Sequence, residues 1–195
     1  MPMPRTIVRT LSLAAALMLA LPVVQPMAAQ PMAAQQAPLM TDLMQDLAGV
    51  EKKFIDLAKA TPDDKLSWRP GAGVRSMGEV LLHVASDNYF IPAAFGHAIP
   101  SATGIKSDDY KTLMAYEKRT LSKAQVVAEL EQSFAYMKGI MGKTTAASLT
   151  QPVSLFGMKS TGQGMWILAV THLHEHLGQS IAYARMNGIV PPWSK

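Results

Sequence analysis

Hydrophobic residues recur every three or four positions in several stretches of the chain, with polar residues between them. An α-helix has 3.6 residues per turn, so this spacing places the hydrophobic side chains on one face of a helix. In the first stretch, which ends before Pro62, the apolar positions are Met40, Leu43, Met44, Leu47, Val50, Phe54 and Leu57. The stretch predicts an amphipathic helix that packs against a core.

Two further helices are indicated by capping boxes, in which a serine hydroxyl and a Glu or Gln side chain three residues later each satisfy a backbone N–H. The box at residues 76–79 predicts a helix that continues to about Ala94, with Pro92 weakening its end. The box at residues 122–125 predicts a helix that ends at Gly142. Each box is followed by apolar residues at helical spacing.

A fourth helix is predicted from about residue 162 to 187, with Gly188 at its C-terminal cap. Two long links remain. Residues 96–120 include a short helical turn at about 110–116, and residues 144–164 alternate too briefly to predict a strand. Four long helices joined in this way predict an all-α fold, a four-helix bundle over residues 38–193 whose long links permit crossovers.

The N-terminus has the pattern of a secretory signal. Arg5 and Arg9 precede an apolar run, Leu11–Val24, that is shorter than the roughly 20 residues a membrane-spanning helix needs. We therefore assign residues 1–34 to a signal peptide and flexible segment, with cleavage between about Ala28 and Gln36. The expected product is exported, periplasmic or secreted, with no stable membrane insertion after processing; an uncleaved anchor is the alternative.

Composition narrows the possible functions. The 195 residues include no cysteine, which excludes disulfide scaffolds and thiolate chemistry. The formal charge is +4, but both arginines of the first 34 positions leave with the signal, so 16 basic residues face 14 acidic ones, a charge of +2. This balance is too weak for a protein that binds nucleic acid, and we expect no nucleic-acid partner.

The five histidines carry the most specific chemical signal. His172 and His176 lie one helical turn apart, so both imidazoles can reach one metal ion. His83 lies beside the apolar face of its helix and is the candidate third ligand. His174 points about 200° away from the pair, and His97 is expected to be solvated at a helix end. A hydrogen-bonded core histidine and a chance surface pair are the ordinary alternatives.

Other catalytic patterns are not met. A zinc-protease motif requires His-Glu-x-x-His, but Gly178 occupies the position of its second histidine. The 14 methionines suggest copper handling, yet many lie in the signal or in helix faces, where filling of a core is the simpler account. The sequence has no glycine-rich phosphate loop and no nucleophile triad.

Longer motifs resemble a known family. Residues 171–179 (THLHEHLGQ) and 182–192 (AYARMNGIVPP), together with 66–70 (LSWRP) and 76–83 (SMGEVLLH), are similar to the signature of the DinB/YfiT-like superfamily. The resemblance covers about residues 40–193.

This resemblance implies an up-down-down-up four-helix bundle and a divalent metal, zinc or nickel, held by His83, His172 and His176. It implies chemistry of two kinds: thiol-dependent transfer or isomerisation, and metal-dependent hydrolysis. The usual basic residue before the Gly-Gln pair is Leu177 here. Export is a second departure, because reduced thiols are scarce outside the cytosol.

Three residues are candidates to accept the outer N–H of a ligand imidazole: Glu79 and Asp87, one turn either side of His83, and Gln179, which shares the face of His176. Solvated surface positions are the alternative for each. We expect the three histidines to bring their ring nitrogens within about 3–4 Å of one another.

Two function classes follow. Three histidine ligands leave an open position, which suits a hydrolase or transferase acting on a small-molecule substrate. Direct binding by Glu79 or Asp87 would close the site and favour a non-catalytic or stress-related metal-binding bundle. The sequence leaves a homodimer open.

Overall fold

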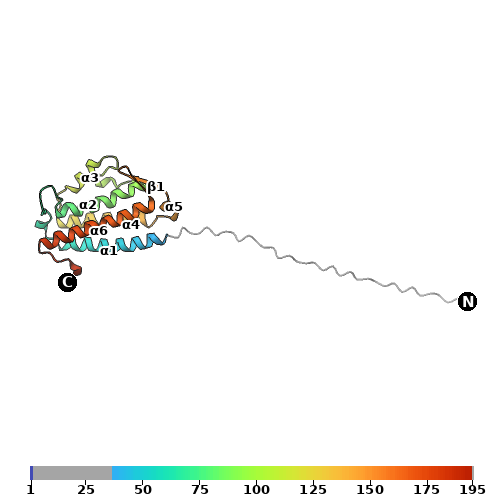
Figure 1. Ribbon diagram of the computed structural model, residues 1–195, viewed down its shortest axis with the longest axis horizontal. Helices are drawn as coiled ribbons and strands as arrows, with labels where there is room; N and C mark the ends of the chain where they lie inside the picture. The colour runs from blue at the N-terminus through green and yellow to red at the C-terminus, as the bar shows by residue number, and fades with distance from the viewer. Residues whose placement is uncertain (2–36, 195) are drawn as a thin grey trace. The chain divides into compact units, whose positions relative to one another are not determined.

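The computed structural model describes Met1 and residues 37–194, so the predicted signal sequence lies outside the described residues. The chain is mostly helical, as predicted (Figure 1). Its long helices are α1 (Pro38–Ala60), α2 (Met77–Phe90), α4 (Lys123–Met141) and α6 (Gly162–Met186). Both α1 and α2 pack against α4 and α6, so the four helices surround one common core.

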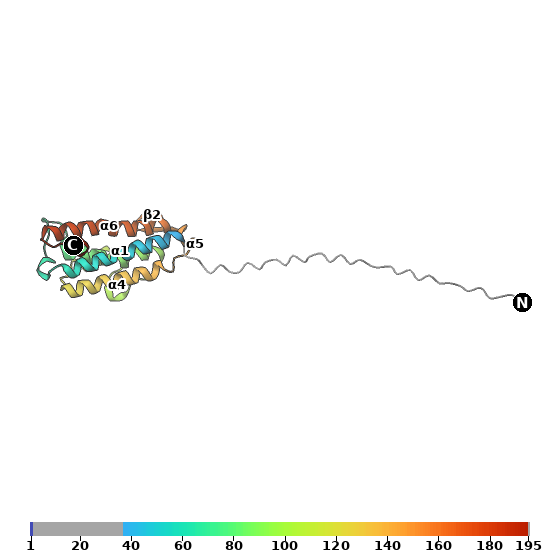
Figure 2. The same cartoon turned by 90° about the horizontal axis from the view of Figure 1, so that it is seen from below.

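The helices run in two directions. Ion pairs join Lys138 to Glu51 and Lys59 to Glu131, which makes α1 and α4 antiparallel. Figures 1 and 2 show α1 and α6 running one way along the bundle and α2 and α4 the other. Along the chain the order is therefore up-down-down-up. Among the described residues, no helix has both the length and the hydropathy needed to cross a bilayer.

The predicted apolar faces form the core. Phe54 of α1 and Phe134 of α4 are fully buried, with ring centroids 6.2 Å apart, and Trp166 of α6 is also fully buried. Burying a large apolar side chain contributes roughly 1.5–3 kcal/mol. One polar pair crosses this core, because Asn88 of α2 donates a hydrogen bond to the Ser133 hydroxyl of α4 over 3.1 Å. It satisfies two groups that burial would otherwise penalise.

Both predicted capping boxes form, at Ser76 and at Ser122. The predicted end of α2 is wrong. The α-helix stops at Phe90 and continues as a 3-10 turn, Ile91–Phe95. Pro92 lacks the N–H that another α-helical turn requires, which explains the change.

The links contain more structure than predicted. The expected helical turn is confirmed as α3 (Tyr110–Glu117), and a short α5 (Ala146–Leu149) precedes a hairpin of β1 (Pro152–Leu155) and β2 (Met158–Thr161). The sequence predicted no strand there. The hairpin forms because Phe156 and Gly157, with φ of 49° and 78°, both adopt the left-handed conformation of a two-residue turn.

Candidate metal centre

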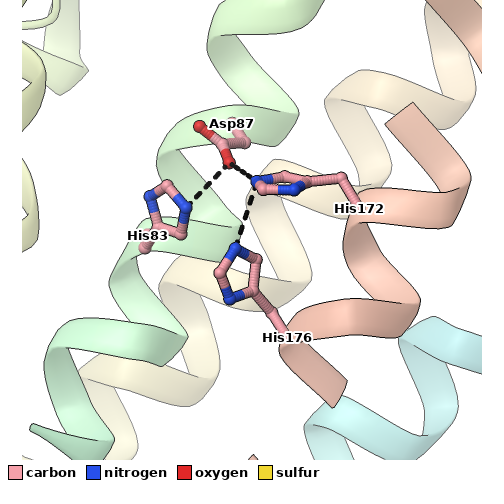
Figure 3. A group of neighbouring side chains, drawn as sticks. All are labelled: His83, Asp87, His172 and His176. Atoms are coloured by element: carbon pink, nitrogen blue, oxygen red, sulfur yellow. Dashed lines mark hydrogen bonds and ion pairs between the residues drawn. The ribbon is translucent and has the colours of Figure 1, made fainter. Parts of the chain in front are cut away.

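Four side chains from two helices turn towards one point between α2 and α6 (Figure 3). His83 and Asp87 are four residues apart on α2, and His172 and His176 have the same spacing on α6. This spacing places each pair on one face of its helix. One ligand atom from each of the four residues lies within 4.8 Å of all the others.

The contacts within this group are short. His172 Nε2 lies 3.1 Å from His176 Nε2, within the spacing we expected for ring nitrogens. Asp87 Oδ2 lies 3.0 Å from His172 Nε2 and 3.3 Å from His83 Nε2. The carboxylate therefore bridges histidines of both helices, as Figure 3 shows.

The outer nitrogen of every imidazole has an acceptor. His83 Nδ1 lies 2.7 Å from Glu117 Oε1, and His176 Nδ1 lies 2.9 Å from Gln179 Oε1. His172 Nδ1 lies 3.2 Å from a carboxylate oxygen of Glu175. An acceptor at Nδ1 keeps the proton there, which leaves Nε2 free to bind a metal. All three Nε2 atoms belong to the converging group.

Glu117 is the most buried of these acceptors, with 1% of its surface exposed. Its other oxygen, Oε2, accepts a hydrogen bond from Nε of Arg75 over 2.9 Å and forms an ion pair with Nη2 of the same residue over 2.9 Å. Burial alone would raise the pKa of this carboxyl. The hydrogen bonds and charges of His83 and Arg75 outweigh burial, so the pKa of Glu117 is lowered.

The two α6 histidines of the donor group differ in their affinity for protons. The hydrogen bond to Asp87 is the main reason that the pKa of His172 is raised above its usual value, against the opposing effect of burial. Burial is the main reason that the pKa of His176 is lowered. His176 therefore favours the neutral form that binds metals, whereas His172 attracts a proton.

The residues fit a divalent metal ion. Three imidazole nitrogens and a carboxylate oxygen are donors that zinc and nickel accept. The 3.1 Å approach of two Nε2 atoms brings their lone pairs together unless a proton or cation lies between them. Because each Nδ1 is held from outside, the group has the chemistry of a metal site, and this His/Asp group is able to hold a divalent ion.

The candidate supporting residues have different positions. Gln179 contacts His176 as predicted, and its side-chain amide donates onward to Tyr183 Oη over 2.9 Å. Asp87 is not behind the ligands but among them. Glu79 instead accepts hydrogen bonds from Arg69 and from the backbone of Ser76, so its role here is to cap α2.

The remaining histidines lie outside the group. His174 Nε2 points to Asp46 of α1, at 2.9 Å, and His97 is exposed at the end of the turn after α2. Sequence reasoning missed Glu117, since nothing in the pattern of the long link indicates which residue returns to His83. It also missed Glu175, although the spacing of three from His172 was a usable signal.

Three histidines and a carboxylate converge here from two facing helices of a bundle. This arrangement is typical of helical-bundle proteins that bind metal between their helices. The family comparison is more specific. The chain belongs to the DinB superfamily, whose family model matches residues 46–180. No functionally curated protein matches the chain.

Solved structures agree with this fold. A DinB-like protein from Bacillus cereus ATCC 10987 has 17% identity and a TM-score of 0.62, covering 78% of this chain and 95% of its own. A DinB-like protein from Bacillus subtilis has 19% identity and a TM-score of 0.59, covering 79% of this chain and 97% of its own. A conserved protein from Enterococcus faecalis has 15% identity and a TM-score of 0.64, covering 75% of this chain and 95% of its own.

Proposed function

We propose that this protein is a metal-dependent enzyme, a hydrolase or a transferase, that acts on a small molecule. His83, His172 and His176, with Asp87 beside them, would hold a zinc or nickel ion. One observation carries the proposal: a pocket of about 300 Å³ adjoins the donor group, and three of the four donor residues, His83, Asp87 and His172, are part of its lining. A substrate in that pocket would meet the ion directly.

The donor types support a catalytic role. Structural zinc sites are typically closed by cysteine thiolates, whereas catalytic sites use histidine and carboxylate and keep a position open. This chain has no cysteine. A divalent ion held here supplies Lewis acidity, which both hydrolysis and transfer can use.

The chain's own residues prepare the site. Glu117 and Gln179 hold the protons of His83 and His176 at Nδ1, which fixes both rings with Nε2 turned inward. The negative charge of Asp87 offsets that of a bound cation. The buried Glu117 of α3, paired with Arg75 just before α2, then fixes α3 against α2 behind His83.

The second candidate is a non-catalytic metal-binding bundle. Asp87 favours it, because its Oδ2 lies among the histidine nitrogens and four protein donors would fill a tetrahedral site. The two functions differ in one property, which is whether an external molecule can reach the ion.

Metal analysis of protein purified without an affinity tag is the first test, and about one zinc or nickel per chain is expected. The ion is then replaced by cobalt, and acetohydroxamate is titrated while the visible absorption is followed. A saturable spectral change indicates an accessible position and justifies screens for hydrolysis and thiol transfer. An unchanged spectrum with four protein ligands supports the non-catalytic bundle instead.

We also propose that the protein is exported, on the basis of Arg5, Arg9 and the short apolar run that follows. N-terminal sequencing of periplasmic or secreted protein should give a start between about Ala28 and Gln36. Recovery of an intact Met1 form from the membrane would contradict this.

A further inference from the structure

The pocket that adjoins the donor group is polar at the donors and apolar elsewhere. Beyond His83, Asp87 and His172 its lining is apolar or aromatic: Phe90, Ile91, Tyr110, Leu113, Leu155, Phe156 and Leu168. No lysine or arginine is among these residues. The part of a ligand that extends from the donor group therefore meets a surface suited to an uncharged, apolar group.

Aromatic rings form one side of this pocket. Phe156 stacks on Phe90, with ring centroids 4.5 Å apart and planes 8° from parallel. Tyr110 meets Phe156 edge-on at 5.4 Å. Phe156 is nevertheless 61% exposed, so most of this ring is not used in packing the protein itself. Flat exposed aromatic surface next to donor groups is suited to a flat ligand.

The backbone at Phe156 gives an independent reason. Its φ of 49° is in the left-handed region, which a bulky residue rarely adopts and which Gly or Asn would occupy at lower cost. Strained positions cluster at functional sites. Stacking on Phe90 uses only part of the ring, and core packing does not explain the surface of Phe156 that stays exposed.

A second hollow is chemically different. A cleft of about 580 Å³ is lined by Gln179, three cationic residues and two carboxylates that pair with the arginines: Arg69, Arg75, Lys118, Glu79 and Glu117. Its lining is strongly charged, and none of the four donor residues is part of it. The hollow that reaches the donors directly is thus the apolar one.

We propose that the pocket between α2, α3, α6 and the hairpin tip binds a flat, uncharged aromatic group of the substrate, packed against Phe156, while a polar group of the same molecule reaches the metal donors. This rests on the proposed function and names its substrate class. Phe156 is then a specificity-determining residue, carried on the hairpin and separate from the metal ligands.

The test uses two probes with the same chelating group, acetohydroxamate and benzohydroxamate, titrated against the full metal-loaded protein. Benzohydroxamate should bind at least about tenfold more tightly, as expected for burying and stacking one ring. The Phe156→Asn variant should lose most of this preference and keep its acetohydroxamate affinity. Its melting temperature should be unchanged or higher, because asparagine tolerates the left-handed backbone.

Met186→Asn is the matched control, since Met186 is exposed on α6 and does not line the pocket. It should leave both affinities unchanged. Equal affinity of the wild type for the two probes would overturn the proposal. So would a Phe156→Asn variant that weakens both probes equally, because the hairpin would then act by supporting the metal site.

A metal-free arm separates this inference from the proposed function. Toluene titrated into the metal-free protein should shift the NMR signals of Phe90 and Phe156. In the Phe156→Asn variant, toluene should no longer shift the signals of Phe90. If toluene binds but neither hydroxamate reaches the metal-loaded protein, the aromatic pocket stands and the enzymatic proposal fails. If toluene causes no shift, the aromatic pocket is wrong.

Discussion

The two helices that form the donor group hold their histidines in different ways. On α2, the side chain of His83 is 11% exposed and its outer nitrogen meets a buried carboxylate, that of Glu117, which is itself paired with Arg75. On α6, His172 is 31% exposed, and its outer nitrogen meets the side chain of Glu175, which is 73% exposed. One histidine is thus fixed by a buried carboxylate that is paired with a half-buried arginine, and the other by a solvated contact.

The difference shows two ways of positioning a ligand. The α6 pair owes its geometry to helical spacing, so it needs only that α6 be helical. His83 joins it only when α2 and α3 pack correctly, and the Arg75–Glu117 chain stabilises that packing. We expect changes behind His83 to disturb metal binding far more than changes behind His172.

Removal of a ligand should have the largest effect. His172→Ala and His83→Ala should each abolish stoichiometric metal binding, because each removes one imidazole from the converging group and leaves an incomplete ligand set that water and chelators can compete with. His174→Ala should leave about one ion per chain, since that ring faces Asp46. Elemental analysis of the three variants measures this. Loss of metal in His174→Ala would contradict the assigned ligand set.

Glu117→Gln should have the next largest effect. Loss of the charge behind His83 should lower metal affinity by about 10- to 100-fold, the usual range for an outer partner of a histidine ligand. Glu79→Gln is the matched control, because Glu79 contacts Arg69 and Ser76, and glutamine also completes a capping box. Competition with a chelator gives both constants, and equal losses would show that Glu117 has no special role.

The effect of pH on stability should be smaller than that of Glu117→Gln on metal affinity. Its direction should be opposite in the metal-free and the metal-loaded protein. In the metal-free protein the pKa of His172 is raised. Its stabilising contribution is therefore present below the unfolded pKa, near 6.5, and is lost as pH rises through the folded pKa. The difference in melting temperature between the wild type and His172→Ala should follow this trend.

The metal-loaded protein should behave in the opposite way over the same interval. A metal competes with the proton on His172, so metal affinity should rise with pH by at most about tenfold per unit for each proton released. Thermal melts of both forms between about pH 6 and pH 8 compare the two trends. Parallel trends would mean that His172 does not exchange its proton for the ion.

The smallest effect is expected at Glu175. Its carboxylate is mostly solvated, and exposed ion pairs contribute about 0–1 kcal/mol. Glu175→Gln should therefore reduce metal affinity less than about fivefold. A loss as large as that of Glu117→Gln, measured with the same chelator, would remove the asymmetry between the two helices.

Most of the fold could be predicted from the sequence because its signals are local. Apolar spacing and capping residues define the long helices, and proline marks the end of α1. The end of α2 was misplaced, since the chain continues as a 3-10 turn that keeps a helical pattern through Pro92. The hairpin was missed because Phe156 occupies a turn position where glycine or asparagine is the recognisable signal.

In the candidate site, too, the residues placed by local spacing could be predicted, and those placed by packing between helices could not. The helical spacing of His172 and His176, and the position of His83 on an apolar face, were enough to bring the three together. The place of Glu117 depends on how α3 folds back on α2, which no periodicity encodes. Asp87 has the right spacing from His83, yet only the packing of α6 shows that it faces His172 as well.

A metal bound by these donors would also reduce the conformational entropy available to the chain. Asp87 and His172 are in contact although 85 residues separate them in the sequence, and the chain has no cysteine. An ion bound by both helices would be a reversible cross-link that closes about half of the described chain, from the end of α2 to the middle of α6, into one loop. A disulfide closing a loop of such length stabilises a fold by roughly 4–5 kcal/mol. In a protein without cysteine, a metal between α2 and α6 would take the place of that covalent staple.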